Sequence, residues 1–173
     1  SFHHSKVLTS GEGGIITTND PELAKKIKRI RGIGLDRSVN NYQAFEAGSN
    51  SKMSEITAIL AILHTDKANS IIGERRDIAN EYDNRIKFSK DIFKFVQPDK
   101  TKSSYYKYYI RFSDSETRRS MMNFLASKGI DLPPLTYSVT CDKQKIAKKL
   151  KWQVPQPLTN THYMTKHHLC LPM

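Results

Sequence analysis

The sequence predicts an α/β chain in two parts, residues 1–88 and residues 89–173. In the first part, apolar residues recur at intervals of three and four, which is typical of helices with one buried face. In the second part, apolar and polar residues alternate over 92–96 and 106–112, which indicates half-buried strands. We therefore expect helices in the first part and a small α+β domain in the second.

The clearest helix is predicted directly after Asp20. Asp20 is a favourable N-cap, and Pro21 suits the first helical position. The apolar stripe consists of Leu23, Ile27 and Ile30. Gly32 and Gly34 end the helix. Its many basic residues are expected to form a solvated face close to the helix C-terminus, where the dipole favours cations.

A long segment without periodicity, 35–49, is predicted to be a loop. Two helical stripes follow it, over 53–63 and 71–86, and we expect both to be core or subunit interface. Farther on, Asp114 is predicted to cap another helix. Residues 132–137 read as an irregular or edge strand because they contain two prolines, and 142–151 read as a short basic helix.

The formal charge of +11 raises the possibility of an anionic partner. The basic residues are spread over several predicted helices and no common nucleic-acid motif is present, so we expect no nucleic-acid partner. No apolar stretch is long enough to span a bilayer and no signal peptide opens the chain. Only two cysteines, Cys141 and Cys170, are present, which fits a reducing cytoplasm.

The histidines do not predict a metal site. His162, His167 and His168 with Cys170 match no standard zinc spacing, and His3 and His4 add two more histidines at the other end of the chain.

The residues with the most chemical potential lie in the first fourteen. Gly11, Gly13 and Gly14 permit a tight turn, and residues 15–18 read as a strand. Lys6 therefore lies at the mouth of a predicted strand-turn-strand unit. A lysine held in such a place can form a Schiff base with a carbonyl compound if its neutral amine is accessible.

The string Ser-Phe-His-x-x-Lys-x-Leu-Thr-x-Gly-Glu-Gly-Gly over 1–14 closely resembles the Schiff-base segment of the DegT/StrS-like sugar-nucleotide aminotransferases. These are pyridoxal-phosphate (PLP) enzymes of the fold-type I aminotransferase superfamily. The resemblance implies that Lys6 binds PLP covalently and that Ser1 binds the cofactor phosphate. It also implies that 1–88 is the end of the PLP-binding large domain and 89–173 the small C-terminal domain.

A second segment, 48–60, resembles the family's Gly-aromatic-Asn-aromatic-Arg-Met motif. The resemblance implies a homodimer in which Asn50 reaches the PLP phosphate of the partner subunit. The chain departs from the motif because serines replace the aromatics and Lys52 replaces arginine, and lysine lacks the bidentate geometry of arginine. Tyr106 and Cys141 also stand where the family often has other residues, histidine among them.

The resemblance implies transfer of an amino group from an amino acid, glutamate in most of the family, to a nucleotide-linked keto-sugar. Lys6 argues against the related dehydratase branch, which has histidine in its place. Family members are considerably longer, so we interpret the chain as an internal fragment and predict that alone it binds PLP weakly or not at all and is inactive. The alternative is a non-enzymatic basic module that binds nucleic acid or an anionic surface.

Overall fold

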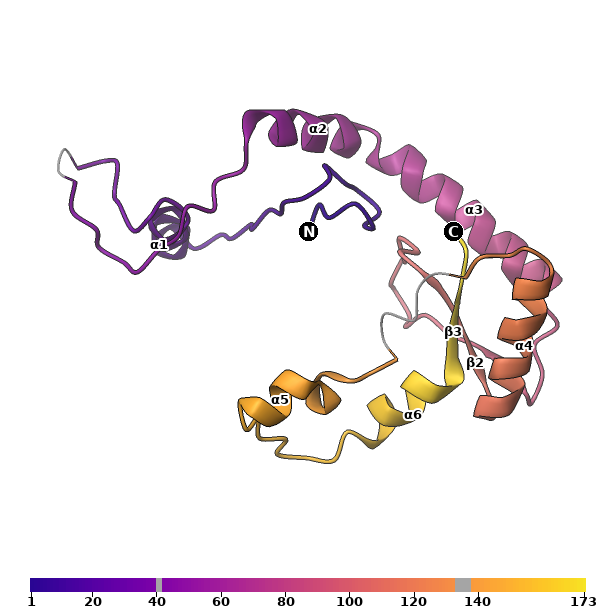
Figure 1. Cartoon of the computed structure of the whole chain (residues 1–173). Helices are drawn as coiled ribbons and strands as arrows, with labels where there is room; N and C mark the ends of the chain where they lie inside the picture. The colour runs from indigo at the N-terminus through magenta and orange to yellow at the C-terminus, as the bar shows by residue number, and fades with distance from the viewer. Residues whose placement is uncertain (40–41, 133–137) are drawn as a thin grey trace. The chain divides into compact units, whose positions relative to one another are not determined.

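The computed structural model describes residues 1–39, 42–132 and 138–173. It divides into two compact units, Ser1–Ile71 and Ile72–Met173. The division falls within a helix, α3 (Ala68–Arg85), instead of after residue 88. Because this helix supplies residues to both units, the limits of the family's large and small domains stay a prediction. Figure 1 shows the order of the elements along the chain.

The first unit contains the two predicted helices α1 (Pro21–Arg31) and α2 (Glu55–Asp66). Asp20 caps α1 as expected, because its carboxylate accepts hydrogen bonds from the backbone N–H groups of Glu22 and Leu23. The strand predicted at 15–18 is wrong. In the part of the chain that the structure describes, this stretch pairs with no strand, and Ile15 and Ile16 are about 70% exposed.

The second unit is built on a three-stranded antiparallel sheet in the order β1-β2-β3. The strands are β1 (Ile92–Lys94), β2 (Tyr108–Phe112) and β3 (His168–Leu171). In the central strand every second residue is buried, as the alternation predicted. Ile92 pairs with Phe112, and Ile110 pairs with Leu169.

One face of this sheet forms the core of the second unit. The buried residues are Ala79, Tyr108, Ile110, Phe112, Leu169 and Leu171. Partly buried apolar residues pack against them, among them Tyr82 of α3, Ile86 directly after it, and Met121 and Leu125 of α4 (Ser115–Ser127). Asp114 caps α4 as predicted. Burial of one apolar face against helices is what stabilises a small antiparallel sheet.

The end of the chain holds elements that the sequence pattern did not reveal. The predicted basic helix is a 3-10 turn, η1 (Cys141–Lys143), followed by the short α5 (Lys145–Lys149). Helix α6 (Thr159–His167) leads directly into β3 and was not predicted. Most of the irregular strand expected at 132–137 lies outside the described residues.

Candidate active site

The predicted site begins with a loop that main-chain hydrogen bonds close around Lys6. The N–H of Phe2 donates to the carbonyl of Gly13 at 2.8 Å, and the N–H of Ser10 donates to the carbonyl of Phe2 at 3.0 Å. Within the loop, the N–H of Lys6 donates to the carbonyl of His3 at 2.9 Å. Lys6 is half-buried. The lysine therefore lies in a backbone-fixed loop, although the loop is not the β-hairpin that the sequence suggested.

Gly13 allows this loop to lie against the start of α2. Its φ is +126°, which strongly favours glycine. A Cβ at this position would lie 2.7 Å from Cε of Met53 and 3.7 Å from Cγ2 of Thr57. The glycine thus serves two purposes, the turn itself and the close approach to the neighbouring helix.

Ser1 directly precedes the closed loop that holds Lys6, and it is exposed. Its Oγ accepts a hydrogen bond from the N–H of His3 at 3.4 Å. A hydroxyl that accepts in this way keeps its own hydrogen for donation to another acceptor, such as a phosphate oxygen. A Cβ at Gly14 would lie 3.9 Å from the Cα of Ser1, so the chain passes close to Ser1 again before it leaves the loop.

Asn50 lies on a different segment, which runs antiparallel to the end of α1. The N–H of Ser49 donates to the carbonyl of Ile30 at 2.9 Å, and Asn50 forms an isolated bridge with Gly32. Its side chain is exposed. The resemblance implies that this amide contacts the PLP phosphate of the partner subunit. The structure describes a single chain, so that role stays a prediction.

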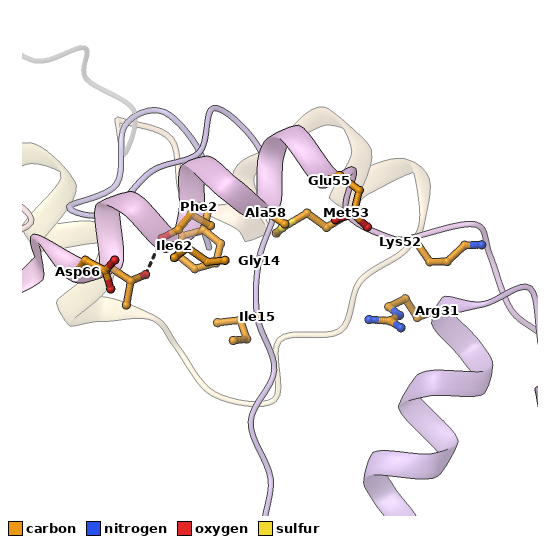
Figure 2. A pocket seen from close by; sticks show the side chains of 12 residues that line it. Phe2, Gly14, Ile15, Arg31, Lys52, Met53, Glu55, Ala58, Ile62 and Asp66 are labelled. Carbon is orange, nitrogen blue, oxygen red and sulfur yellow. Dashed lines mark hydrogen bonds between the residues drawn. The ribbon is translucent and has the colours of Figure 1, made fainter. Parts of the chain in front are cut away.

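The cavity in Figure 2 has a volume of about 720 Å³ and lies between the N-terminal segment and α2. Its apolar wall includes Phe2, Ile15, Ala58 and Ile62. Arg31 and Lys52 lie at one end, and Asp66 lies at the other. Lys6 is not among the residues that line it. This cavity therefore adjoins the closed loop without being the space in front of the amine.

A partly buried ion pair that joins α1 to the predicted loop was missed by the sequence analysis. The guanidinium of Arg29 donates to Oδ2 of Asp36 through Nε at 2.9 Å and through Nη2 at 2.5 Å. Ser38 donates to Oδ1 through both its hydroxyl, at 2.6 Å, and its N–H, at 3.0 Å. The Ser38 hydroxyl and Arg29 hold the pKa of the Asp36 carboxyl far below its ordinary value. The sequence held one signal for this ion pair, which is that Arg29 and Asp36 carry opposite charges on the two sides of Gly32 and Gly34.

His3, His4 and Glu12 bring three potential metal ligands within 4.8 Å of one another. The hydrogen bonds of His3 describe a different arrangement. Its Nδ1 accepts from the N–H of Ser5 at 3.2 Å, which places the ring hydrogen on Nε2, 3.6 Å from the Glu12 carboxylate. The ring nitrogens of His3 are thus engaged by Ser5 and Glu12.

The C-terminal histidines are engaged in hydrogen bonds. Nε2 of His162 lies 2.9 Å from a carboxylate oxygen of Asp142. Nδ1 of His167 and Nδ1 of His168 each lie 2.6 Å from a backbone carbonyl oxygen of α6. Burial raises the pKa of the Cys170 thiol, which lowers its reactivity. Of the family departures, Cys141 is exposed, and Lys107 lies over the ring of half-buried Tyr106.

The sequence model of the DegT/DnrJ/EryC1/StrS aminotransferase family matches residues 1–173. The chain belongs to this family. It is 30% identical over 168 residues to GDP-perosamine synthase of Escherichia coli O157:H7, covering 88% of this chain and 43% of the relative. It is 29% identical to dTDP-4-amino-4,6-dideoxy-D-glucose transaminase of Shigella dysenteriae, covering 100% and 46%. The chain thus spans less than half the length of these relatives.

The fold agrees with the family assignment. The crystal structure of DesV from S. venezuelae in complex with a ketimine intermediate superposes with a TM-score of 0.86 at 25% identity, covering 99% of this chain and 44% of that one. The predicted fold class, an α/β piece of a PLP-dependent transferase, is therefore confirmed. No helix among the described residues has the length and apolarity needed to cross a bilayer.

Proposed function

We propose that this chain carries the lysine-bearing part of a PLP-dependent aminotransferase that acts on a nucleotide-linked keto-sugar. The observation that carries the proposal is the position of Lys6, half-buried in a loop that the Phe2–Gly13 and Ser10–Phe2 hydrogen bonds close. The family match over the whole chain gives this lysine its expected chemistry. Two relatives are named for GDP-linked and dTDP-linked sugars, so the nucleotide is left open.

The residues of the loop fit the cofactor. Lys6 supplies an amine, and Ser1 supplies a hydroxyl whose oxygen already accepts from His3 and whose hydrogen remains for a phosphate oxygen. Gly13 provides the close packing that fixes the loop on α2. PLP, when bound, supplies an electron sink that stabilises negative charge at the Cα of the amino substrate.

Lys6 would act twice in this reaction. Its Nζ would hold the cofactor covalently before the amino donor arrives, and the donor's amine would then displace it. Once released, the same Nζ would take the proton from the donor Cα and return a proton at the cofactor carbon, as general base and then general acid. A backbone-fixed loop favours both proton transfers because the Lys6 amine must stay within reach of the donor Cα and of the cofactor carbon.

Ser1 and Asn50 would hold the phosphate from two sides. In the proposed homodimer, Ser1 comes from the subunit that carries Lys6, and Asn50 comes from the other subunit. The exposed position of the Asn50 side chain on the 48–51 segment is compatible with that role. We further propose glutamate as the amino donor, from the family resemblance, and a cytoplasmic location, which the two free cysteines fit.

Borohydride reduction in the presence of PLP tests the assignment. The longer parent protein, which the fragment interpretation requires, should be labelled at Lys6 in peptide maps, and Lys6→Arg should abolish the label. The parent should also convert glutamate to 2-oxoglutarate when a nucleotide-linked keto-sugar is supplied. A label on another lysine would overturn the site assignment.

The 173-residue chain alone provides the second arm of this test. We predict little visible absorption from bound PLP and no transamination, because a family member uses further groups outside this chain to hold the pyridine ring. Strong cofactor absorption of the purified chain would contradict this prediction.

A further inference from the structure

The segment that contains η1 and α5 carries a concentrated positive charge. Residues 138–173 contain six lysines, no arginine and a single acid, Asp142. Five of these lysines lie on η1, on α5 and in the turn that ends α5, and all five are exposed: Lys143, Lys145, Lys148, Lys149 and Lys151. A cluster of one charge sign on a surface attracts partners of the opposite sign.

The single acid leaves most of this charge in place. The side chain of Asp142 is only 9% exposed, and one of its carboxylate oxygens lies 2.9 Å from Nε2 of His162 and 3.7 Å from Nζ of Lys143. Within the described part of the chain, no ion pair involves the other four lysines of the segment. Asp142 therefore holds η1 beside α6, and four cations remain for a partner outside the chain.

Large apolar side chains lie exposed among these lysines. Ile146, Leu150, Trp152 and Val154 are between 44% and 57% exposed. Ile146 and Leu150 are four residues apart and therefore share one side of α5. We call the five lysines together with these four apolar residues the lysine–tryptophan patch. A run of lysines alone is normally a solvated face, but apolar area within it is stabilised when a partner covers it.

A turn with the hydrogen bonds of a Schellman motif fixes Trp152 at the end of α5. The N–H of Trp152 donates to the carbonyl of Ala147 at 3.0 Å, and the N–H of Lys151 donates to the carbonyl of Lys148 at 3.2 Å. Lys151 has a φ of +51°, a conformation that glycine usually adopts at this position. Lysine there keeps a cation directly beside the indole. Ala147 is only 3% exposed, so it determines which side of α5 faces the protein.

We propose that the lysine–tryptophan patch attaches this chain to an anionic lipid surface. Lysines close to such a surface are attracted by its headgroups. Tryptophan favours the boundary between headgroups and acyl chains, because its ring is largely apolar and its N–H is polar. The patch would lie on the bilayer without crossing it. The cytoplasmic leaflet carries the negative surface potential, which agrees with the cytoplasmic location proposed above.

Two other partners fit the patch less well. A nucleic acid would neutralise the lysines, but Ile146, Leu150 and Val154 have no ring on which a base could stack and would stay in water. Arginine, whose planar guanidinium suits nucleic-acid phosphates, is absent from 138–173. A second copy of the patch would bring its own lysines against these and repel them. An anionic lipid surface pairs with the cations and also covers the apolar side chains.

Trp152 is the only tryptophan of the chain, so tryptophan fluorescence reports on this patch alone. On vesicles of equal parts phosphatidylcholine and phosphatidylglycerol, the emission of the 173-residue chain should shift to the blue, and lipids brominated on the acyl chains should quench it. Phosphatidylcholine vesicles should cause no shift, and added salt should weaken the binding. An unchanged emission on the anionic vesicles would overturn the proposal, even if the chain sedimented with them.

Removal of charge tests whether the attachment is local. Lys148→Gln with Lys149→Gln should weaken vesicle binding about 25-fold, because each lysine near an anionic leaflet contributes roughly fivefold. The matched control is Lys26→Gln with Lys28→Gln, which removes the same charge from exposed positions of α1 in the first unit. It should change the affinity by no more than about twofold. Equal losses in the two variants would mean that only net charge matters and would overturn the proposal.

Removal of apolar area tests the second component. Leu150→Ser should weaken vesicle binding by about tenfold. Leu63→Ser is the matched control, because Leu63 of α2 is 53% exposed and Leu150 is 57% exposed, and it should leave the binding unchanged. All the substituted side chains are exposed, so circular dichroism should show the same fold in every variant. Equal effects of the two serine variants would contradict insertion of the patch.

Two further results would assign the patch to a different partner and so overturn the proposal. Tighter binding of a single-stranded oligonucleotide than of anionic vesicles would favour the basic binding module. Self-association in sedimentation velocity that Leu150→Ser abolishes, without vesicle binding, would show that a second copy covers the apolar residues.

Discussion

The two units of the chain differ in how many of their apolar residues they bury. Among the described residues, Ile72–Met173 buries seven apolar side chains, five of them on its sheet, whereas Ser1–Ile71 buries only Ala61. Helix α2 exposes five large apolar residues: Ile56, Ile59, Leu60, Ile62 and Leu63. A helix that is apolar on most sides is normally covered. The second unit therefore has a core of its own, and the first unit is organised around backbone contacts and charged groups.

The largest expected effect tests the core of the second unit. Phe112 is fully buried in the central strand, and Phe112→Ala should cost about 3–5 kcal/mol. The control is Ile59→Ala in the first unit, where the side chain is 55% exposed and the change should stay within about 0.5 kcal/mol. Hydrogen exchange of the β2 amides should rise strongly for the first variant and stay unchanged for the second. Equal effects would refute the contrast between the units.

A smaller effect tests the backbone packing of the first unit. Gly34→Ala places a methyl group against the carbonyl of Glu46 at a φ of +83°, where the left-handed conformation alone costs about 1–2 kcal/mol. The N–H of Phe45, which donates to the carbonyl of Gly34 at 2.9 Å, should lose protection from exchange. Gly73→Ala is the matched control, because its Cβ meets nothing within 4 Å and α3 should gain about 0.5–1 kcal/mol. Protection of Phe45 in the Gly34 variant would show that the loop adapts.

The smallest effect concerns pH. Hydrogen bonds from Thr117 and neighbouring donors lower the pKa of the Asp114 carboxyl from 3.8 to about 2. Because the folded-state pKa is depressed, its contribution is complete above about 4 and is lost as the pH falls through about 2. Asp114→Asn keeps a cap and removes the titration. The Tm difference between the unchanged chain and this variant should therefore shrink between pH 4 and pH 2, and a constant difference would contradict the assignment.

Local signals in the sequence predicted local structure well. Asp20 and Asp114 were identified as caps, and the alternation of Tyr108, Ile110 and Phe112 gave the central strand. Helix α6 and β3 were missed because Thr159–His167 lacks a clear apolar stripe, and β3 is fixed by its pairing with β2, a contact between residues far apart in the chain.

The site was predicted less completely. The motif around Lys6 placed the lysine in a tight loop, but the strand expected at 15–18 did not form, and no segment among the described residues pairs with it. The pair of Arg29 and Asp36 depends on how the chain turns between them, which the opposite charges around Gly32 and Gly34 indicate only weakly. The roles of Ser1, Lys6 and Asn50 in cofactor binding stay predictions.

The mutual contact of Gly34 and Gly48 has a consequence for how this protein can evolve. A methyl group on either residue would overlap main-chain atoms, which no change of side-chain rotamer can relieve. A saturation library selected only for a folded product should therefore keep glycine at both positions, while exposed neighbours such as Lys28 and Arg37 vary freely.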